Sequence, residues 1–142
     1  MIKPLRVRDF MVTNLHVVTP ETEIMTAVQG LVDHNISGLL VVDQDGQLAG
    51  ILTERDCINV ALQAGYFDEG GGRVRHFMTA DVKTVDADTA LMDIADAFAS
   101  NSFRRFPVME NGKLVGLVAR RDILRAFTCG AWFAAPDTER RR

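Results

Sequence analysis

The sequence predicts an α+β fold made of two copies of a β-α-β-β-α unit, and an internal repeat is the main observation behind it. At an offset of 67 positions, Val7-Arg8-Asp9-Phe10-Met11 aligns with Val74-Arg75-His76-Phe77-Met78. After one gap near Gln44, residues 46–56 align with residues 112–122 at an offset of 66. The chain has 142 residues, of which 47% are hydrophobic and 25% charged, as in an ordinary globular protein.

Each copy is expected to begin with a short strand and a helix. Apolar residues at helical spacing follow Thr22 in the first copy and Thr89 in the second. Two apolar runs then flank Asp45-Gly46 or Asn111-Gly112, which predicts a β-hairpin in each copy. The expected strands are 17–18, 39–42, 48–52, 84–85, 106–109 and 114–118, and the expected last helices are 54–62 and 120–127.

The repeat also sets the expected domain organisation. The first copy spans residues 7–62 and the second spans residues 74–127. A Gly-rich linker over 63–73 joins them, and residues 128–142 form a C-terminal tail. One unit is too small to bury both faces of its sheet, so we expect the copies to pack about a pseudo-twofold axis and share one core.

Composition and spacing argue against several classes of protein. The net charge of -3 disfavours a general nucleic-acid binder. Cys57 and Cys129 are not spaced as a disulfide scaffold, and His16, His34 and His76 share no metal-ligand spacing, so we expect free thiols and no metal site. No signal peptide or long apolar run is present, which predicts a cytoplasmic protein outside the membrane. No catalytic motif is present either, so no enzyme activity is expected.

Thr53 and Asp56, at the start of the first copy's last helix, allow two interpretations. As structural residues, Thr53 caps the helix while Asp56 completes the capping box and complements the helix dipole. As binding residues, the helix N-terminus with its hydroxyl attracts phosphate, and the carboxylate accepts two hydrogen bonds from a ribose diol. The second interpretation describes a ribonucleotide site.

Positive charge is concentrated in the second copy. The first copy holds 2 basic and 8 acidic residues (net -6), whereas the second holds 8 basic and 7 acidic residues (net +1). Arg104-Arg105 precede the second hairpin, and Arg120-Arg121 begin the last helix. Such arginines are either solvated surface residues or bidentate ligands for phosphate oxygens. With pseudo-twofold packing, residues ahead of one hairpin can face the last helix of the other copy.

The duplicated motifs resemble those of a tandem pair of cystathionine-β-synthase (CBS) domains, also called a Bateman module. The motifs are Val7-Arg8-Asp9-Phe10-Met11 and Gly50-Ile51-Leu52-Thr53-Glu54-Arg55-Asp56, and the similarity runs from Val7 to Phe127. The resemblance implies a stand-alone regulatory module of bacterial type. Such a module would bind AMP, ADP, ATP or another adenosyl compound, need no cofactor, and signal occupancy to an unknown partner protein.

Carried over to this sequence, the resemblance implies one competent nucleotide site per chain. The ribose would lie on Asp56 beside Thr53, with the phosphates near Arg104 and Arg105. The base would contact Ile51, Val82, Lys83, Thr84, Phe103 and Pro107. A second site would use Asp122, Val17 and Ser37, but Ala119 replaces the threonine and Ser37-Gly38 replace the arginine pair. We therefore expect the second site to be weak or empty.

The resemblance also implies a homodimer, since such modules commonly pair through their helices, and a single module leaves apolar helix faces open. A rival hypothesis is a ligand-free dimerisation or interaction module in which Thr53 and Asp56 are only caps. A nucleic-acid binder that uses the arginines is a third hypothesis. It requires a steep salt dependence of affinity, and the acidic first copy argues against it.

Overall fold

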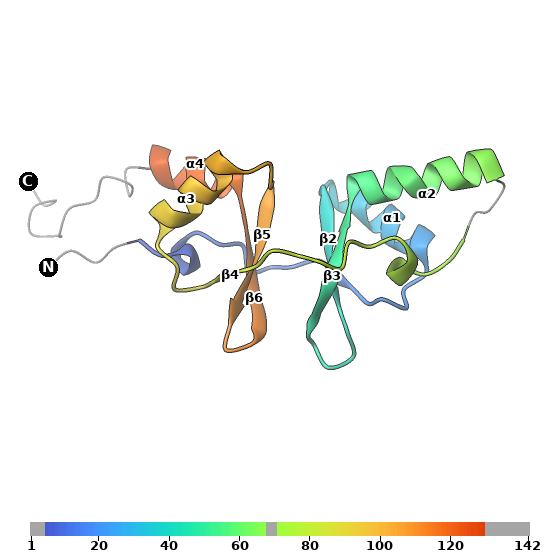
Figure 1. The fold of residues 1–142 in the computed structure, drawn as a ribbon, viewed down its shortest axis with the longest axis horizontal. Coiled ribbons are helices and arrows are strands. Elements are labelled where there is room, and N and C mark those ends of the chain that lie inside the picture. The colour runs from blue at the N-terminus through green and yellow to red at the C-terminus, as the bar shows by residue number, and fades with distance from the viewer. Residues whose placement is uncertain (1–4, 68–70, 130–142) are drawn as a thin grey trace, which may run out of the picture. The chain divides into compact units, whose positions relative to one another are not determined.

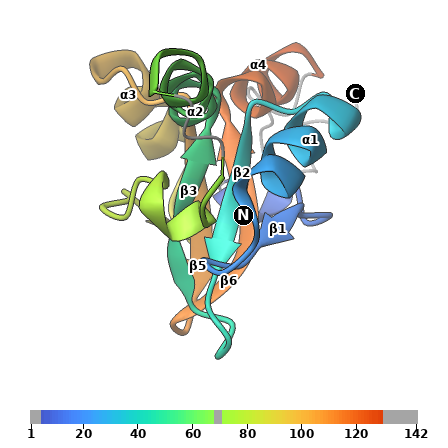
Figure 2. The same ribbon diagram turned by 90° about the vertical axis from the view of Figure 1, so that its right-hand side faces the viewer.

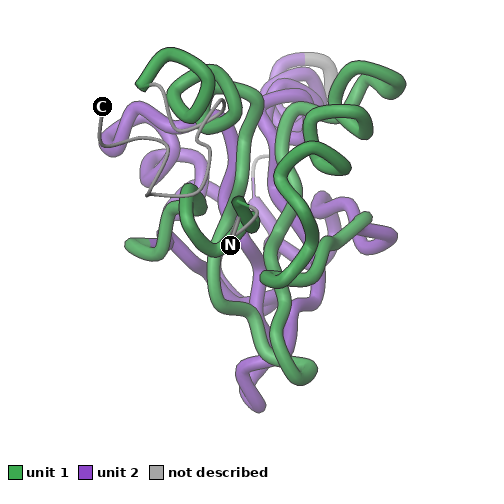
Figure 3. Tube along the Cα trace, turned by 90° about the vertical axis from the view of Figure 1, so that its left-hand side faces the viewer, with its two compact units in different colours: residues 1–14, 83–142 green, residues 15–82 purple. Residues whose placement is uncertain are grey.

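The protein divides into two compact units, which Figure 3 colours separately. The computed structural model describes residues 5–67 and 71–129. One unit covers residues 15–82 (the 15–82 unit), and the other combines residues 83–129 with residues 5–14 (the 83–129 unit). The opening segment of each copy therefore belongs to the unit built from the other copy. In these segments the compact units differ from the sequence copies 7–62 and 74–127.

The 15–82 unit has a three-stranded sheet in the order β1-β2-β3. Strand β1 is parallel to β2, and β2 is antiparallel to β3, as the hairpin prediction requires. Both helices lie on the same face of this sheet (Figures 1 and 2). The elements are β1 (Val17–Val18), α1 (Ile24–His34), β2 (Gly38–Val42), β3 (Leu48–Thr53), α2 (Glu54–Phe67) and the 3-10 helix η2 (Val74–His76).

The 83–129 unit repeats this arrangement with the sheet order β4-β5-β6. Strand β4 is parallel to β5, and β5 is antiparallel to β6. The elements are the 3-10 helix η1 (Val7–Asp9), β4 (Val85–Asp86), α3 (Leu91–Ser100), β5 (Arg105–Glu110), β6 (Lys113–Ala119) and α4 (Arg120–Thr128). The predicted β-α-β-β-α order is confirmed in both copies, and the fold is α+β.

One local prediction is wrong. Helix α2 continues to Phe67, five residues past the expected end at residue 62, so the first part of the expected linker is helical. Gln63 and Ala64 are good helix formers, which explains the extension. Helix α1 is capped by Glu23, whose carboxylate accepts from the backbone N–H groups of Met25 and Thr26. Gly70 of the linker and the tail from residue 130 lie outside the described residues.

Each unit has a hydrophobic core of its own. The exchanged segments contribute to these cores, since Val74 is buried in the 15–82 unit and Val7 is buried in the 83–129 unit. The first core contains Ile24, Ala27, Leu31, Leu39, Val41, Leu52, Val60 and Val74. The second contains Val7, Ala87, Ile94, Phe98, Phe106, Val108 and Val118.

Ion pairs at equivalent positions hold the exchanged segments. Arg8 of η1 pairs with Asp88 at 2.7 Å and also with Glu110. Arg75 of η2 pairs with Glu21, which the internal repeat aligns with Asp88. The arginine of the duplicated opening motif thus docks each segment onto the unit built from the other copy.

Gly50 of β3 allows the backbone of residue 79 to approach closely. A Cβ atom at Gly50 would lie 2.6 Å from the carbonyl oxygen of Thr79, closer than side chains tolerate. We expect Gly50→Ala to lower the free energy of unfolding by about 1–3 kcal/mol, because this backbone cannot move without breaking its bridge to β3. The matched control is Gly65→Ala in α2, where a Cβ meets nothing within 4 Å and a gain of about 0.5–1 kcal/mol is expected. Urea denaturation measures both, and equal stability of the two variants would contradict the close approach.

Candidate functional site

Asp56 is anchored at the N-terminus of α2 by a reciprocal pair of caps. The Thr53 N–H and the Thr53 hydroxyl both donate to Oδ2 of Asp56, at 2.9 Å and 3.0 Å. In return, the Asp56 N–H donates to Oγ1 of Thr53 at 3.2 Å. The capping box expected from the spacing of these residues is therefore formed.

A third residue, Thr79, also contacts Asp56. The Thr79 hydroxyl donates to Oδ2 of Asp56 at 3.4 Å. Thr79 is positioned by a two-way backbone bridge to Ile51, with both N–H to O distances at 2.9 Å. Thr79 was not among the site residues predicted from the sequence. The repeat aligns Thr79 with Val12, which makes the equivalent bridge to Leu117. The position directly after the opening motif could therefore have identified Thr79 from the sequence.

Capping leaves Asp56 with spare acceptor capacity. The three hydrogen bonds that the Asp56 carboxylate accepts all reach Oδ2, and within the described residues Oδ1 accepts none. The side chain is half-buried, and a carboxylate offers about four acceptor positions. Asp56 is therefore a fixed anion with one unused oxygen, so a structural role and a binding role are compatible.

The equivalent residue of the second copy, Asp122, has different surroundings. Its Oδ2 accepts from the Ala119 N–H at 2.8 Å, but Ala119 has no hydroxyl to donate. Its Oδ1 lies 3.3 Å from Nη2 of Arg125. Asp122 is also buried, so both of its oxygens are occupied away from solvent.

The other predicted site residues are divided between the two units. Ile51, Thr53, Asp56, Val82, Val17 and Ser37 lie in the 15–82 unit. Lys83, Thr84, Phe103, Arg104, Arg105, Pro107 and Asp122 lie in the 83–129 unit. Of the first-site residues, Thr53 contacts Asp56 directly, and Ile51 is linked to Asp56 through Thr79.

The loop before β5 carries an aromatic ring and a cation. Phe103 is 41% exposed, and its ring contacts the buried ring of Phe106 with centroids 5.4 Å apart. Arg104 is exposed, while Arg105 forms the first residue of β5 and is half-buried. Pro107, expected to contact the base, is fully buried.

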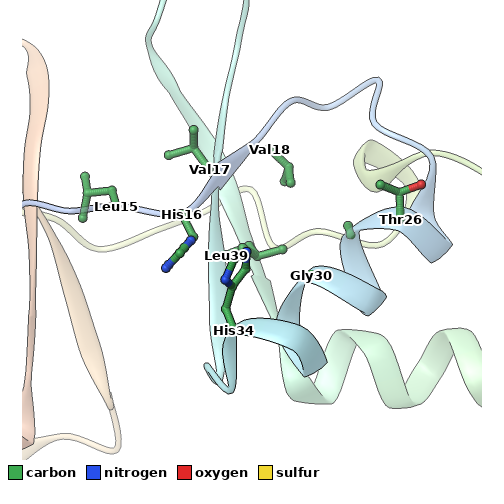
Figure 4. Close-up of a pocket in the computed structure, with 9 residues that line it drawn as sticks. Leu15, His16, Val17, Val18, Thr26, Gly30, His34 and Leu39 are labelled. Carbon is green, nitrogen blue, oxygen red and sulfur yellow. The ribbon is translucent and has the colours of Figure 1, made fainter.

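A separate pocket of about 320 Å³ opens beside β1 and α1 in the 15–82 unit (Figure 4). The rings of His16 and His34 stack there, with centroids 4.0 Å apart. Sequence spacing did not predict this pair, because His16 precedes β1 and His34 ends α1. The lining residues are Leu15, His16, Val17, Val18, Thr26, Ala27, Gly30, His34 and Leu39, so Val17 lies in this pocket. Across residues 5–67 and 71–129, no group of three or more potential ligand side chains is placed to bind a metal ion.

The helices expose apolar side chains. Ile58 and Leu62 of α2 and Leu124 and Phe127 of α4 are exposed. None of the helices in the described part of the chain has both the length and the apolar character needed to cross a membrane. Exposed apolar residues on a helix are typical of surfaces that meet a partner.

The thiol next to Asp56 is expected to react slowly. Burial raises the pKa of Cys57 to about 11, and the neighbouring carboxylates of Asp56 and Glu54 add to the increase. Cys129 is exposed. Because the thiolate is the reactive form, we expect a disulfide reagent at pH 8 to label Cys129 well before Cys57, with Cys57 labelling accelerating as the pH approaches 11. The single variants Cys57→Ser and Cys129→Ser show which cysteine gives each kinetic phase of labelling. Equal labelling rates of the two cysteines at pH 8 would contradict this prediction.

Comparison with known proteins completes this picture. The CBS domain family model matches residues 7–63 and 74–128. An uncharacterised 17.7 kDa protein of Acidianus ambivalens is 36% identical over 122 residues, which cover 85% of this chain and 72% of that protein. The structure of CBSX2 from Arabidopsis thaliana in complex with AMP has a TM-score of 0.77 and 32% identity, covering 87% of this chain and 96% of that chain. The CBS domain pair of MJ0100, in complex with 5'-methylthioadenosine and S-adenosyl-L-methionine, has a TM-score of 0.76 and 26% identity, covering 89% of this chain and 98% of that chain. With both copies matched and the order of elements shared, this chain belongs to the CBS domain family as a tandem CBS pair.

Proposed function

We propose that this CBS pair is a regulatory module that binds an adenosine compound through the ribose on Asp56. The observation that carries the proposal is the unused Oδ1 of a carboxylate fixed by Thr53 and Thr79 at the start of α2. The complexes of CBSX2 with AMP and of MJ0100 with two adenosyl compounds support the same ligand class. The proposed ligands are AMP, ADP, ATP or another adenosyl compound, and no catalytic role is proposed.

The chemistry of the ligand fits the chemistry of the residues. A ribose diol donates two hydrogen bonds, and a carboxylate held in place by three donors accepts them without losing further side-chain freedom. The negative charge of Asp56 repels phosphate, so we propose that Arg104 and Arg105 bind the phosphate group. The proposed contacts of the base are Ile51, Val82, Lys83, Thr84 and Phe103, and the fully buried Pro107 is not among them.

A ligand can act as a signal only if it binds two states of the protein with different affinity. We propose that occupancy changes the state of the CBS pair and that a partner protein responds. A homodimer paired through its helices would also cover the exposed apolar side chains of α2 and α4. The same exposed side chains favour the second candidate function, a ligand-free interaction module.

Thermal unfolding in the presence of AMP, ADP, ATP, NAD or S-adenosylmethionine tests the proposal. A ligand present at about 100 times its dissociation constant adds roughly 2.7 kcal/mol, which raises the midpoint by several degrees. We expect such a shift with at least one adenosine compound. The absence of a shift with every compound would reject the adenosine module and leave the interaction module in its place.

The phosphate contacts have a test of their own. We expect Arg104→Ala and Arg105→Ala to reduce the affinity for AMP by about tenfold or more, because each removes a charge-assisted hydrogen bond. Adenosine has no phosphate, so its affinity is expected to stay within about twofold of the wild-type value. Competition dialysis measures both ligands, and an equal loss for AMP and adenosine would contradict the assigned role.

A further inference from the structure

The two copies differ at one position that contacts the key carboxylate. The repeat aligns Asp56 with Asp122, and three residues later it aligns Asn59 with Arg125. Asn59 is exposed on α2, whereas Arg125 forms an ion pair with Asp122 on α4. One copy therefore has a neutral amide where the other has a guanidinium.

The Arg125 guanidinium is held from two sides. Nη2 lies 3.3 Å from Oδ1 of Asp122 and donates to the carbonyl oxygen of Phe10 at 3.0 Å. Phe10 belongs to the exchanged opening segment, so this contact ties α4 to residues far away in the sequence. The Asp122 side chain is 9% exposed and the Arg125 side chain is 53% exposed, so a buried carboxylate is paired with a guanidinium that reaches the surface.

The lost hydroxyl at residue 119 explains why Asp122 needs Arg125. In the first copy, the Thr53 and Thr79 hydroxyls both donate to Asp56. Ala119 and Val12, at the equivalent positions, have no hydroxyl. The Ala119 N–H is then the one hydrogen-bond donor to the buried Asp122 carboxylate among the contacts described above, and the Arg125 cation supplies a second partner for its charge. The cost is that another donor must compete with a charged group for Oδ1.

We propose that Arg125 closes the second copy to ribose ligands and thereby confines the adenosine compound to Asp56. This inference rests on the proposed function and adds the residue that selects between the two copies. A ribose diol would have to displace a charged donor that is itself fixed by the Phe10 carbonyl. At Asp56 no such donor has to be displaced, because Asn59 has no positive charge.

Moving the arginine into the first copy provides the first test. Asn59→Arg places a guanidinium three residues after Asp56, and the Phe77 carbonyl is equivalent to the Phe10 carbonyl that holds Arg125. We expect its affinity for AMP to fall about tenfold, as when a hydrogen bond to a charged group is lost. The control is Gln63→Arg, which adds the same charge one turn farther along α2 at an exposed position. Its affinity for AMP is expected to equal or slightly exceed that of the wild type, because a distant cation only attracts phosphate.

Opening the second copy provides the reverse test. The double variant Ala119→Thr/Arg125→Asn restores one hydroxyl and removes the cation, which recreates Thr53 and Asn59 of the first copy and leaves Val12 unchanged. Adenosine is the probe, because no arginine pair is available there for a phosphate. We expect equilibrium dialysis to give two adenosine molecules per chain, against one for the wild type. The control Ala119→Thr/Arg121→Asn removes an equally charged, exposed residue of α4 and is expected to stay at one.

The outcomes separate the two proposals. If the wild type binds neither AMP nor adenosine, the proposed function fails and the inference fails with it. A different outcome rejects only the role of Arg125 and leaves the proposed function standing. In that outcome the wild type binds AMP, Asn59→Arg and Gln63→Arg bind it equally well, and the double variant still binds one adenosine per chain. Thermal unfolding of each variant without ligand verifies that it is folded, and Asn59→Gln serves as a further neutral variant at the same position.

Discussion

The Asp56→Ala variant is expected to bind AMP at least about 100-fold more weakly than the wild type. The substitution removes both acceptors of the ribose diol, and each hydrogen bond to a charged group contributes about 1.5–3 kcal/mol. The folded protein should survive, because the loss of one helix cap costs only about 1 kcal/mol. Equilibrium dialysis with AMP gives the affinity, and urea denaturation gives the free energy of unfolding.

Asp122→Ala is the matched control for this prediction. Asp122 caps α4 as Asp56 caps α2, so its removal costs a similar cap together with the ion pair to Arg125. The affinity for AMP is nevertheless expected to stay within about twofold of the wild-type value, because the second copy is closed. An equal loss of AMP affinity in the two variants would show that the two carboxylates are not distinguished as we propose.

The Phe106→Ala variant is expected to lower the free energy of unfolding by about 3–5 kcal/mol. Phe106 of β5 is 2% exposed and is among the largest buried side chains of the protein. Its ring packs against the ring of Phe98 from α3, with centroids 4.8 Å apart. Truncation leaves a cavity between sheet and helix that neighbouring side chains fill only in part.

Phe103→Ala is the control for this core prediction. Phe103 contacts the same ring, but 41% of the residue is exposed, so its removal leaves little cavity. We expect a loss below about 1.5 kcal/mol in the free energy of unfolding. The same variant should weaken AMP binding, since Phe103 is a proposed contact of the base. Urea denaturation compares the two variants, and equal destabilisation would contradict the placement of the core around Phe106.

Local patterns were sufficient to predict the strands and helices. The hairpins follow from apolar runs around Asp45-Gly46 and Asn111-Gly112, and both turns place glycine at a φ of 78°. The exchange of opening segments was not predictable in this way. Val7 and Val74 have the same local sequence context, Val-Arg-x-Phe-Met, which does not distinguish one core from the other. Long-range contacts, such as the ion pair of Arg8 with Asp88 and the backbone hydrogen bond from Val7 to Thr89, show which unit each segment joins.

For the site residues too, contacts between residues near in sequence could be predicted, whereas contacts between residues far apart in sequence could not. The pairing of Thr53 with Asp56 spans three residues and was visible as a capping pattern. Thr79 and the link from Phe10 to Arg125 depend on where the exchanged segments dock, so the sequence analysis missed both. The absence of a threonine at position 119 indicated that the second nucleotide site is weaker than the first. The ion pair between Asp122 and Arg125 became apparent only in the structure.

Isothermal titration of the wild-type chain with AMP tests the proposed single adenosine site most directly. We expect saturable binding of one AMP per chain, and prior addition of adenosine should compete for the same site. Two equivalent AMP molecules per chain would contradict the difference between Asp56 and Asp122. No saturable binding of AMP, repeated with ADP, ATP and S-adenosylmethionine, would contradict the proposed function itself.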